Sequence, residues 1–124
     1  MPSIKDLFSQ EPASVAWSEQ NGRTVGTSVG FVLDLWPDRI EAAALFPPDN
    51  AALVGRNSTL LQLLLVATRP DWQSSSAWLA NAMRTAARSK EIVHEETNYT
   101  RGVRLVWDKR HSRATLRIRG GEQG

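Results

Sequence analysis

The 124-residue chain contains no cysteine and only two histidines, His94 and His111. The lack of cysteine excludes a disulfide framework, an iron–sulfur cluster, a thiolate zinc site and a cysteine nucleophile. Two histidines are too few for a multi-histidine zinc site. We therefore expect the protein to use no metal and no cofactor.

Long apolar runs and targeting signals are also scarce. The longest strongly apolar run, residues 60–67 with Gln62 inside it, is shorter than the roughly 20 residues that a membrane span needs. The first residues lack the charged and then apolar pattern of a secretory signal. No glycine-rich phosphate loop and no nucleophile elbow occurs. These absences predict a cytoplasmic protein without membrane contact.

The composition that remains is typical of a folded domain. Hydrophobic residues make up 41% of the chain and charged residues 23%. A chain of this length buries enough surface to fold without disulfides or a bound metal. We expect a single domain over residues 1–124, with a short N-terminal helix or arm at 1–11 and a flexible tail at 120–124.

Turn signals divide the first half into three predicted strands. A period of two around Trp17 is followed by Asn21-Gly22, which favours a type I′ hairpin and places Trp17 opposite Gly26. A large ring can cover a bare glycine in this position. The second predicted strand continues to Leu35, with Val29, Phe31, Leu33 and Leu35 on one face. A turn at 36–39 then leads to a third strand at 40–46.

The middle of the chain has helical periodicity. Asn57 or Ser58 is the expected cap of a helix that is apolar on nearly all sides and ends at Arg69-Pro70. A second helix carries an apolar stripe from Trp78 to Ala87. Strands are expected at 92–99, 103–108 and 113–119. The predicted fold class is α+β: an antiparallel sheet of two three-stranded β units with a central helical pair packed on one face, in the order β-β-β-α-α-β-β-β.

The register of the last hairpin follows from its apolar residues. If residues 109–112 form a four-residue loop, Leu105 faces Leu116 and six apolar or small residues lie on one face, whereas a slip of one residue would scatter them: Val103, Leu105, Trp107, Ala114, Leu116 and Ile118. The same register puts Arg104 directly opposite Arg117 on the other face. Like charges opposed across strands are destabilising, so another charge must offset them.

The strand before this hairpin offers one such charge. A three-residue connection at 100–102 would turn Tyr99 toward the core and put Glu96 on the polar face, diagonal to the arginines. An internal ion-pair network on a solvated surface is then one explanation. The other is that an external anion such as phosphate supplies the negative charge, because the planar guanidinium binds phosphate oxygens in pairs.

Basic residues are concentrated near the C-terminus. Residues 1–83 have a net charge of −3, and residues 84–124 have a net charge of +5. This asymmetry is typical of a surface that contacts the phosphate backbone of DNA or RNA. A solvated face and an acidic protein partner remain as alternatives. The candidate nucleic-acid-binding residues are Arg101, Arg104, Lys109, Arg110, Arg113, Arg117 and Arg119.

Exposed aromatic rings would determine whether such a surface can also bind bases by stacking. Trp36 and Trp72, both beside prolines, are the candidate stacking rings, although each also fits a loop anchor packed on the core. Because the chain has no recognition-helix motif and no zinc finger, contact with the phosphate backbone or with a single strand is the expected mode. We therefore expect a non-enzymatic nucleic-acid-binding or regulatory module.

Two other classes of function stay open. Five tryptophans, an apolar helix and exposed strand edges fit a protein-interaction or homo-oligomeric adaptor, with a dimer favoured. In the expected register, His94 faces Asp108 close to Arg113, a trio that would suit a metal-independent phosphodiesterase.

Overall fold

The computed structural model describes residues 3–120 and contains one seven-stranded antiparallel sheet in the order β1-β2-β3-β4-β7-β6-β5. The α+β fold class and the helical pair between two groups of strands are confirmed. The strands are β1 (Ala16–Gln20), β2 (Arg23–Ser28), β3 (Phe31–Leu35), β4 (Arg39–Leu45), β5 (Val93–Asn98), β6 (Val103–Asp108) and β7 (Arg113–Arg119). The helices are α1 (Ile4–Ser9), α2 (Ala51–Thr68) and α3 (Ser75–Arg88).

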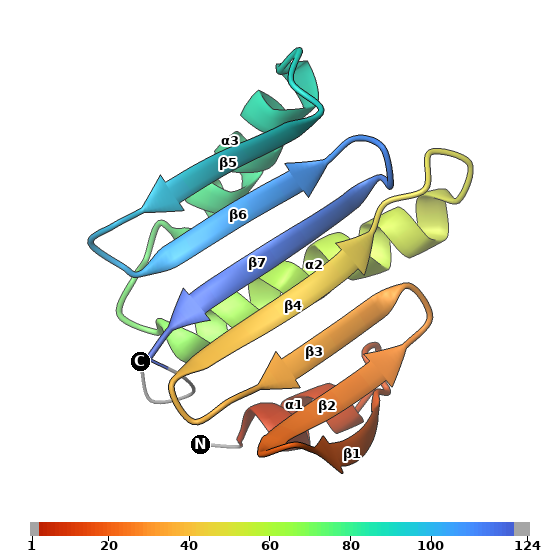
Figure 1. Cartoon of the computed structure of the whole chain (residues 1–124), viewed down its shortest axis with the longest axis vertical. Helices are drawn as coiled ribbons and strands as arrows, with labels where there is room; N and C mark the ends of the chain where they lie inside the picture. Colours follow the sequence, from red (N-terminus) through yellow and green to blue (C-terminus); the bar gives the residue numbers. More distant parts are fainter. Residues whose placement is uncertain (1–2, 121–124) are drawn as a thin grey trace.

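All three helices lie on one face of the sheet, and the other face is open (Figure 1). Helix α2 runs behind β4 and β7, at the centre of the sheet. Its leucines at 60, 61, 64 and 65 are fully buried and pack in one core with the apolar face of the strands. By length and composition α2 could also cross a membrane, but this packing is that of a core helix.

The first hairpin forms as its turn residues predict. Asn21 and Gly22 both have positive φ, and Trp17 faces Gly26 across the two strands. A Cβ atom on Gly26 would lie 2.8 Å from Cζ3 of Trp17, so the ring sits directly on the glycine backbone. The short helix before it is capped by the Ser3 hydroxyl, which accepts a hydrogen bond from the Asp6 N–H at 3.1 Å.

The second expected strand is in fact two strands, so the first β unit has four strands instead of three. A tight turn at Val29 and Gly30 separates β2 from β3, and Val29 is 72% exposed at its tip. Gly30 has φ +64°, a conformation that L side chains rarely adopt. The alternation of apolar residues at 29, 31, 33 and 35 predicted one continuous strand, because the spacing of apolar residues does not show where the backbone adopts a positive φ.

Helix α2 begins earlier than expected, at Ala51, and its cap is Asn50. The Asn50 side chain accepts a hydrogen bond from the Leu53 N–H at 3.0 Å. Asn57 is instead fully buried inside the helix, and its amide donates to the carbonyls of Gly30 (3.1 Å) and Leu45 (2.8 Å). The residue that we expected to cap a helix therefore fastens the helix to the β2–β3 turn and to the end of β4.

The two halves of the sheet meet where β4 pairs with β7. This pairing places Glu41 opposite Arg117 and Arg39 opposite Arg119 on the open face. The backbone N–H of Gly120 donates to the Asp38 carbonyl at 2.8 Å, so the expected flexible tail is held at its first residue. The other residues of that expected tail, 121–124, lie outside the described part of the chain.

Candidate functional site

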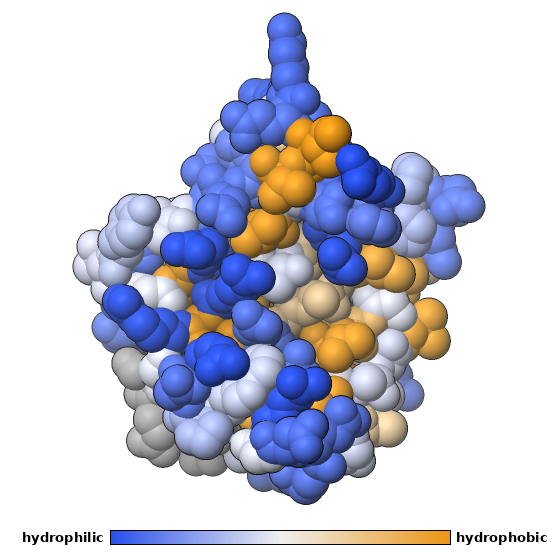
Figure 2. Space-filling model, viewed as in Figure 1, coloured by the Kyte–Doolittle hydropathy of each residue, from blue (hydrophilic) through white to orange (hydrophobic). Residues whose placement is uncertain are grey.

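One end of the open face carries a cluster of four arginines. Arg39 of β4, Arg117 and Arg119 of β7, and Arg104 of β6 line a cavity of about 300 Å³. Figure 2 looks onto this face and shows hydrophilic groups and apolar patches side by side. The last hairpin has the expected register, with Arg104 directly opposite Arg117. We call these four residues the arginine cluster.

Only part of the positive charge in this cluster is neutralised. Arg117 Nε lies 2.9 Å from Glu41 Oε1, and Arg39 Nη1 lies 3.2 Å from Asp38 Oδ1. Within the described chain, no carboxylate comes within ion-pair distance of Arg104 or Arg119. The four arginines and the two carboxylates that line the cavity leave a net charge of +2. The cavity therefore attracts anions.

Glu96 does not neutralise these arginines, because the expected pairing of β5 with β6 is wrong by one residue. The connection has four residues, 99–102, and Asn98 Oδ1 stabilises it by accepting a hydrogen bond from the Arg101 N–H at 3.0 Å. Thr97 consequently faces Arg104, while Glu96 faces Leu105 on the helix side of the sheet. The compensating carboxylate is Glu41, which comes from a strand more than 70 residues away in sequence.

The corrected connection also moves Tyr99. We expected this ring on the core face, but it lies in the turn, is 80% exposed and lines the arginine-cluster cavity. An exposed tyrosine beside arginines can stack on a base or a sugar.

The two tryptophans that we considered for stacking are already in contact with other side chains. Trp36 lies between two guanidinium groups, with Arg39 Cζ 4.0 Å and Arg23 Cζ 5.0 Å from the ring centroid. Trp72 is buried, 7% exposed, and packs against Trp78 with the ring centroids 5.5 Å apart. The loop-anchor interpretation therefore holds for Trp72, and Trp36 makes a cation–π contact with Arg39, which lines the cavity.

The seven basic residues singled out from the sequence do not form one surface. Lys109, Arg110 and Arg113 lie at the other end of the β6–β7 hairpin, at least roughly 13 Å from the arginine cluster along the strands at 3.3 Å per strand residue. Arg113 Nη2 is 3.6 Å from Asp108 Oδ2. Arg101 lies in the turn beside the cluster, where Nη1 is 2.8 Å from Asp71 Oδ2.

The trio considered for phosphodiester chemistry is not assembled. His94 faces Trp107 on the helix side, where its Nε2 is 3.3 Å from Glu96 Oε1. Asp108 lies on the open face and is hydrogen-bonded to His111, 2.8 Å from Nδ1, an interaction that lowers the pKa of the Asp108 carboxyl. The same one-residue shift of β5 explains this separation. Among the described residues, no group of three or more His, Asp and Glu side chains could hold a metal ion.

A pair of acidic side chains adjoins the cluster on the same row of the sheet. Asp34 is directly opposite Glu41, and Arg23 Nε is 3.6 Å from Asp34 Oδ1. Burial raises the pKa of Asp34, the charge of Arg23 counteracts this rise, and the neighbouring Glu41 adds to it. The row thus changes from negative at Asp34 and Glu41 to positive at Arg117 and Arg104.

Sequence reasoning missed Arg39 and Tyr99 as members of the site. Arg39 joins it through the pairing of β4 with β7, which no local pattern encodes. Tyr99 could have been found, because Asn at the first position of a turn favours the longer connection through its side-chain hydrogen bond.

Comparison of the chain with protein-family models, curated proteins and solved structures finds no match.

Proposed function

We propose that this protein binds the phosphate backbone of single-stranded nucleic acid at the arginine cluster, without catalysing a reaction. The observation that carries the proposal is the pair Arg104 and Arg117, held side by side on neighbouring strands, where the one nearby carboxylate, Glu41, pairs with Arg117 alone. Their repulsion costs stability that the described residues only partly offset. A phosphate oxygen that accepts hydrogen bonds from both guanidiniums would offset the rest.

Single-stranded nucleic acid fits this site better than duplex. The arginines line a cavity instead of a broad convex surface, and Tyr99 stands exposed at its edge. An unpaired base can stack on such a ring, whereas a paired base in a duplex cannot. Contacts to phosphate carry no information on base identity, so we expect weak dependence on base sequence.

Salt dependence measures the number of phosphate contacts. We expect wild-type protein to bind a fluorescein-labelled 12-nucleotide oligothymidylate, and the arginine cluster to contribute about −2 to the slope of log K against log salt, since three contacts contribute about −0.7 each for a single strand. The double variant Arg104→Gln/Arg117→Gln should make the slope smaller in magnitude by about 1.4. Lys109→Gln/Arg110→Gln removes the same charge at the far end of the hairpin and should keep the wild-type slope.

Two results would refute this proposal. One is the absence of binding by wild-type protein in about 50 mM salt. The other is an equal flattening of the slope by both double variants, which would mean that net charge and not the site governs binding.

Tyr99 gives an independent test of single-strand binding. Tyr99→Ala should weaken binding of the oligothymidylate by about 1–3 kcal/mol without changing the salt slope, because stacking involves no counterion release. Tyr99→Phe keeps the ring and should bind as wild type does. A 12-base-pair duplex should bind both variants with the wild-type affinity; a loss on the duplex as well would contradict the stacking role.

A second candidate function is self-association through the same open face, and its support is an uncharged strip across four strands. Val32, Ala43, Thr115 and Val106 are neighbours in the sheet, and Val32 is 39% exposed. Two copies packed face to face about an axis along the β4–β7 junction would bring Arg117 of each copy over Glu41 of the other.

This second candidate ranks lower because like charges would meet at one end of the same face. The axis that pairs Arg117 with Glu41 also sets Arg39 of one copy over Arg119 of the other. Light scattering separates the two candidates. If the protein remains monomeric at about 100 µM, a concentration well above the Kd of a typical stable dimer, it has no such interface.

A further inference from the structure

A second basic cavity adjoins the arginine cluster and shares two of its residues. It has a volume of about 310 Å³ and is lined by Arg69, Asp71, Thr100, Arg101, Gly102, Arg119 and Gly120. Gly102 and Arg119 also line the first cavity. The two cavities are therefore neighbours on either side of this pair of residues. We call the second one the turn cavity, because the β5–β6 turn forms one wall.

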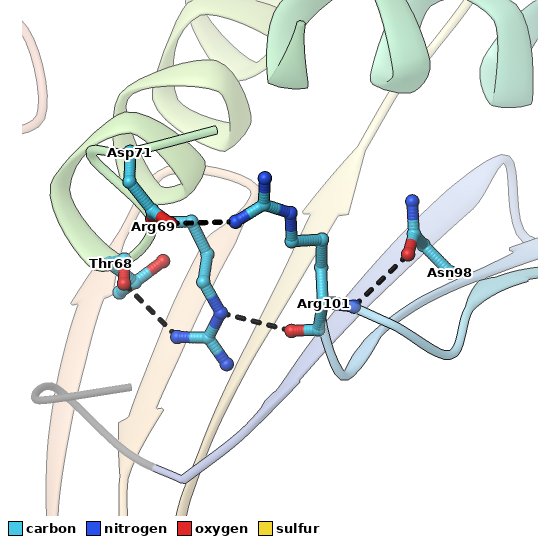
Figure 3. A network of polar contacts seen from close by, with 5 residues as sticks. All are labelled: Thr68, Arg69, Asp71, Asn98 and Arg101. Atoms are coloured by element: carbon cyan, nitrogen blue, oxygen red, sulfur yellow. Dashed lines mark hydrogen bonds and ion pairs between the residues drawn. The ribbon is translucent and has the colours of Figure 1, made fainter. Parts of the chain in front are cut away.

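Arg69 is the buried charge of the turn cavity. It is 8% exposed, and its guanidinium donates to three backbone carbonyls: Nε to Arg101 at 2.9 Å, Nη1 to Thr68 at 3.0 Å and Nη2 to Arg119 at 2.6 Å. Figure 3 shows Arg69 reaching across to the Arg101 carbonyl and back to Thr68. One side chain thus joins the end of α2 to both walls of the cavity.

No carboxylate in the described chain is paired with Arg69. The nearest acid, Asp71, uses its Oδ2 atom to bind Arg101 Nη1 at 2.8 Å, and this hydrogen bond lowers the pKa of Asp71. Burial in turn lowers the pKa of Arg69. A guanidinium has five N–H groups, and the three carbonyls account for three of them. The charge of Asp71 counteracts part of the lowering of the Arg69 pKa, but Asp71 is ion-paired with Arg101 and not with Arg69, so an anion in the cavity beside Arg69 would further stabilise this buried positive charge.

Arg119 and Gly102 lie at the boundary between the two cavities. Gly102 has φ +66°, and a Cβ atom there would come 3.4 Å from Arg119 Nε. The bare glycine lets the Arg119 side chain lie over the turn, at the boundary of both cavities. One flexible chain of phosphates can therefore contact the arginine cluster, then Arg119, then Arg101 and Arg69.

We propose that a bound single strand continues from the arginine cluster past Gly102 into the turn cavity, where Arg101 and Arg69 hold a further phosphate. This inference rests on the proposed function and extends it to a ligand class: strands several nucleotides long instead of mononucleotides. The phosphate takes the place of Asp71 at Arg101, an exchange favoured because Asp71 is 75% exposed and its ion pair is therefore weak.

The test compares two probe lengths in one variant. Arg101→Gln removes the side chain only: the backbone of Arg101 keeps its bonds to Asn98 Oδ1 and Arg69 Nε, so the turn keeps its shape (Figure 3). Salt titrations with labelled 3-nucleotide and 12-nucleotide oligothymidylates report the contacts made by each. Arg110→Gln is the matched control at the other end of the hairpin.

We expect Arg101→Gln to lower the slope for the long probe by about 0.7, which is about a 2.6-fold smaller loss of affinity between 50 and 200 mM salt. The slope for the short probe, which fills the first cavity alone, stays at the wild-type value. An unchanged slope for the long probe, or an equal change for both lengths, overturns the extension into the turn cavity and leaves the arginine-cluster proposal standing. A wild-type protein that binds neither probe overturns both.

Discussion

Asn57 provides the sharpest test of how the helical layer is attached to the sheet. Its side chain is fully buried, and its amide donates to the carbonyls of Gly30 and Leu45 while Oδ1 accepts from Arg56 Nε at 3.2 Å. In Asn57→Ala, the Gly30 carbonyl keeps the Leu45 N–H at 2.8 Å, but the Leu45 carbonyl loses the donor that Asn57 supplies.

The cost follows from this count. An unsatisfied buried acceptor costs about 1–3 kcal/mol, and the space vacated by the side chain adds to it, so we expect a loss of about 2–3 kcal/mol. For a domain of this size that lowers Tm by roughly 6–15 °C. Urea unfolding followed by circular dichroism measures the change as a shift in midpoint at constant m value.

Two further variants make the result interpretable. Asn81→Ala, at an exposed position of α3, should stay within about 0.5 kcal/mol of wild type. Asn57→Asp keeps the shape but replaces the amide donor by a carboxylate that faces two carbonyls, so it should cost at least as much as Asn57→Ala. If Asn57→Ala and Asn81→Ala are indistinguishable, the amide does not hold the helix to the sheet and the argument is wrong.

Two other predictions concern the sheet. Gly26→Ala should destabilise the protein because the new Cβ would lie 2.8 Å from the Trp17 ring, yet in a Trp17→Ala background it should be neutral or stabilising; a double-mutant cycle by urea unfolding that shows no coupling would contradict the contact. Asp34→Asn should stabilise the protein at pH 7, since burial and Glu41 raise the pKa of Asp34 and thereby make its charged form a cost above that pKa. The gain should shrink as pH falls and the wild-type carboxyl takes up its proton, so a gain that grows toward acid pH in urea titrations would refute this cause.

Local signals predicted most of the fold, because they act between residues that are close in sequence. Asn21-Gly22 fixed the first hairpin and the register that puts Trp17 on Gly26. The apolar residues of β6 and β7 determined their register, since a slip of one residue would have put the apolar residues of the two strands on opposite faces.

The errors occurred where one residue type serves two purposes. Asn57 looks like a helix cap in sequence, but burial lets it satisfy carbonyls of distant strands instead. Asn98 looks like the last polar residue of a strand, but its hydrogen bond to the Arg101 N–H adds one residue to the turn and shifts β5 by one position. That single shift removed Glu96 from the polar face and separated His94 from Asp108.

The candidate site was predicted only in part, because it depends on the pairing of β4 with β7. The hairpin register gave Arg104 and Arg117, but Arg39 and the compensating Glu41 come from the other half of the chain. The pairing of β7 with β4 is a long-range contact, because helices α2 and α3 lie between these two strands in sequence.

The two functions proposed for the open face compete for the same residues, and the positive charges on this face favour one function over the other. Face-to-face packing would cover Arg104 and Arg117 and oppose Arg39 to Arg119 without a carboxylate between them. Such repulsion counts against a second copy but not against a polyanion, which lowers the energy of every arginine that it meets. Repulsion between Arg39 and Arg119 thus disfavours a dimer, whereas all four guanidiniums favour a phosphate chain, and this is why we place nucleic-acid binding first.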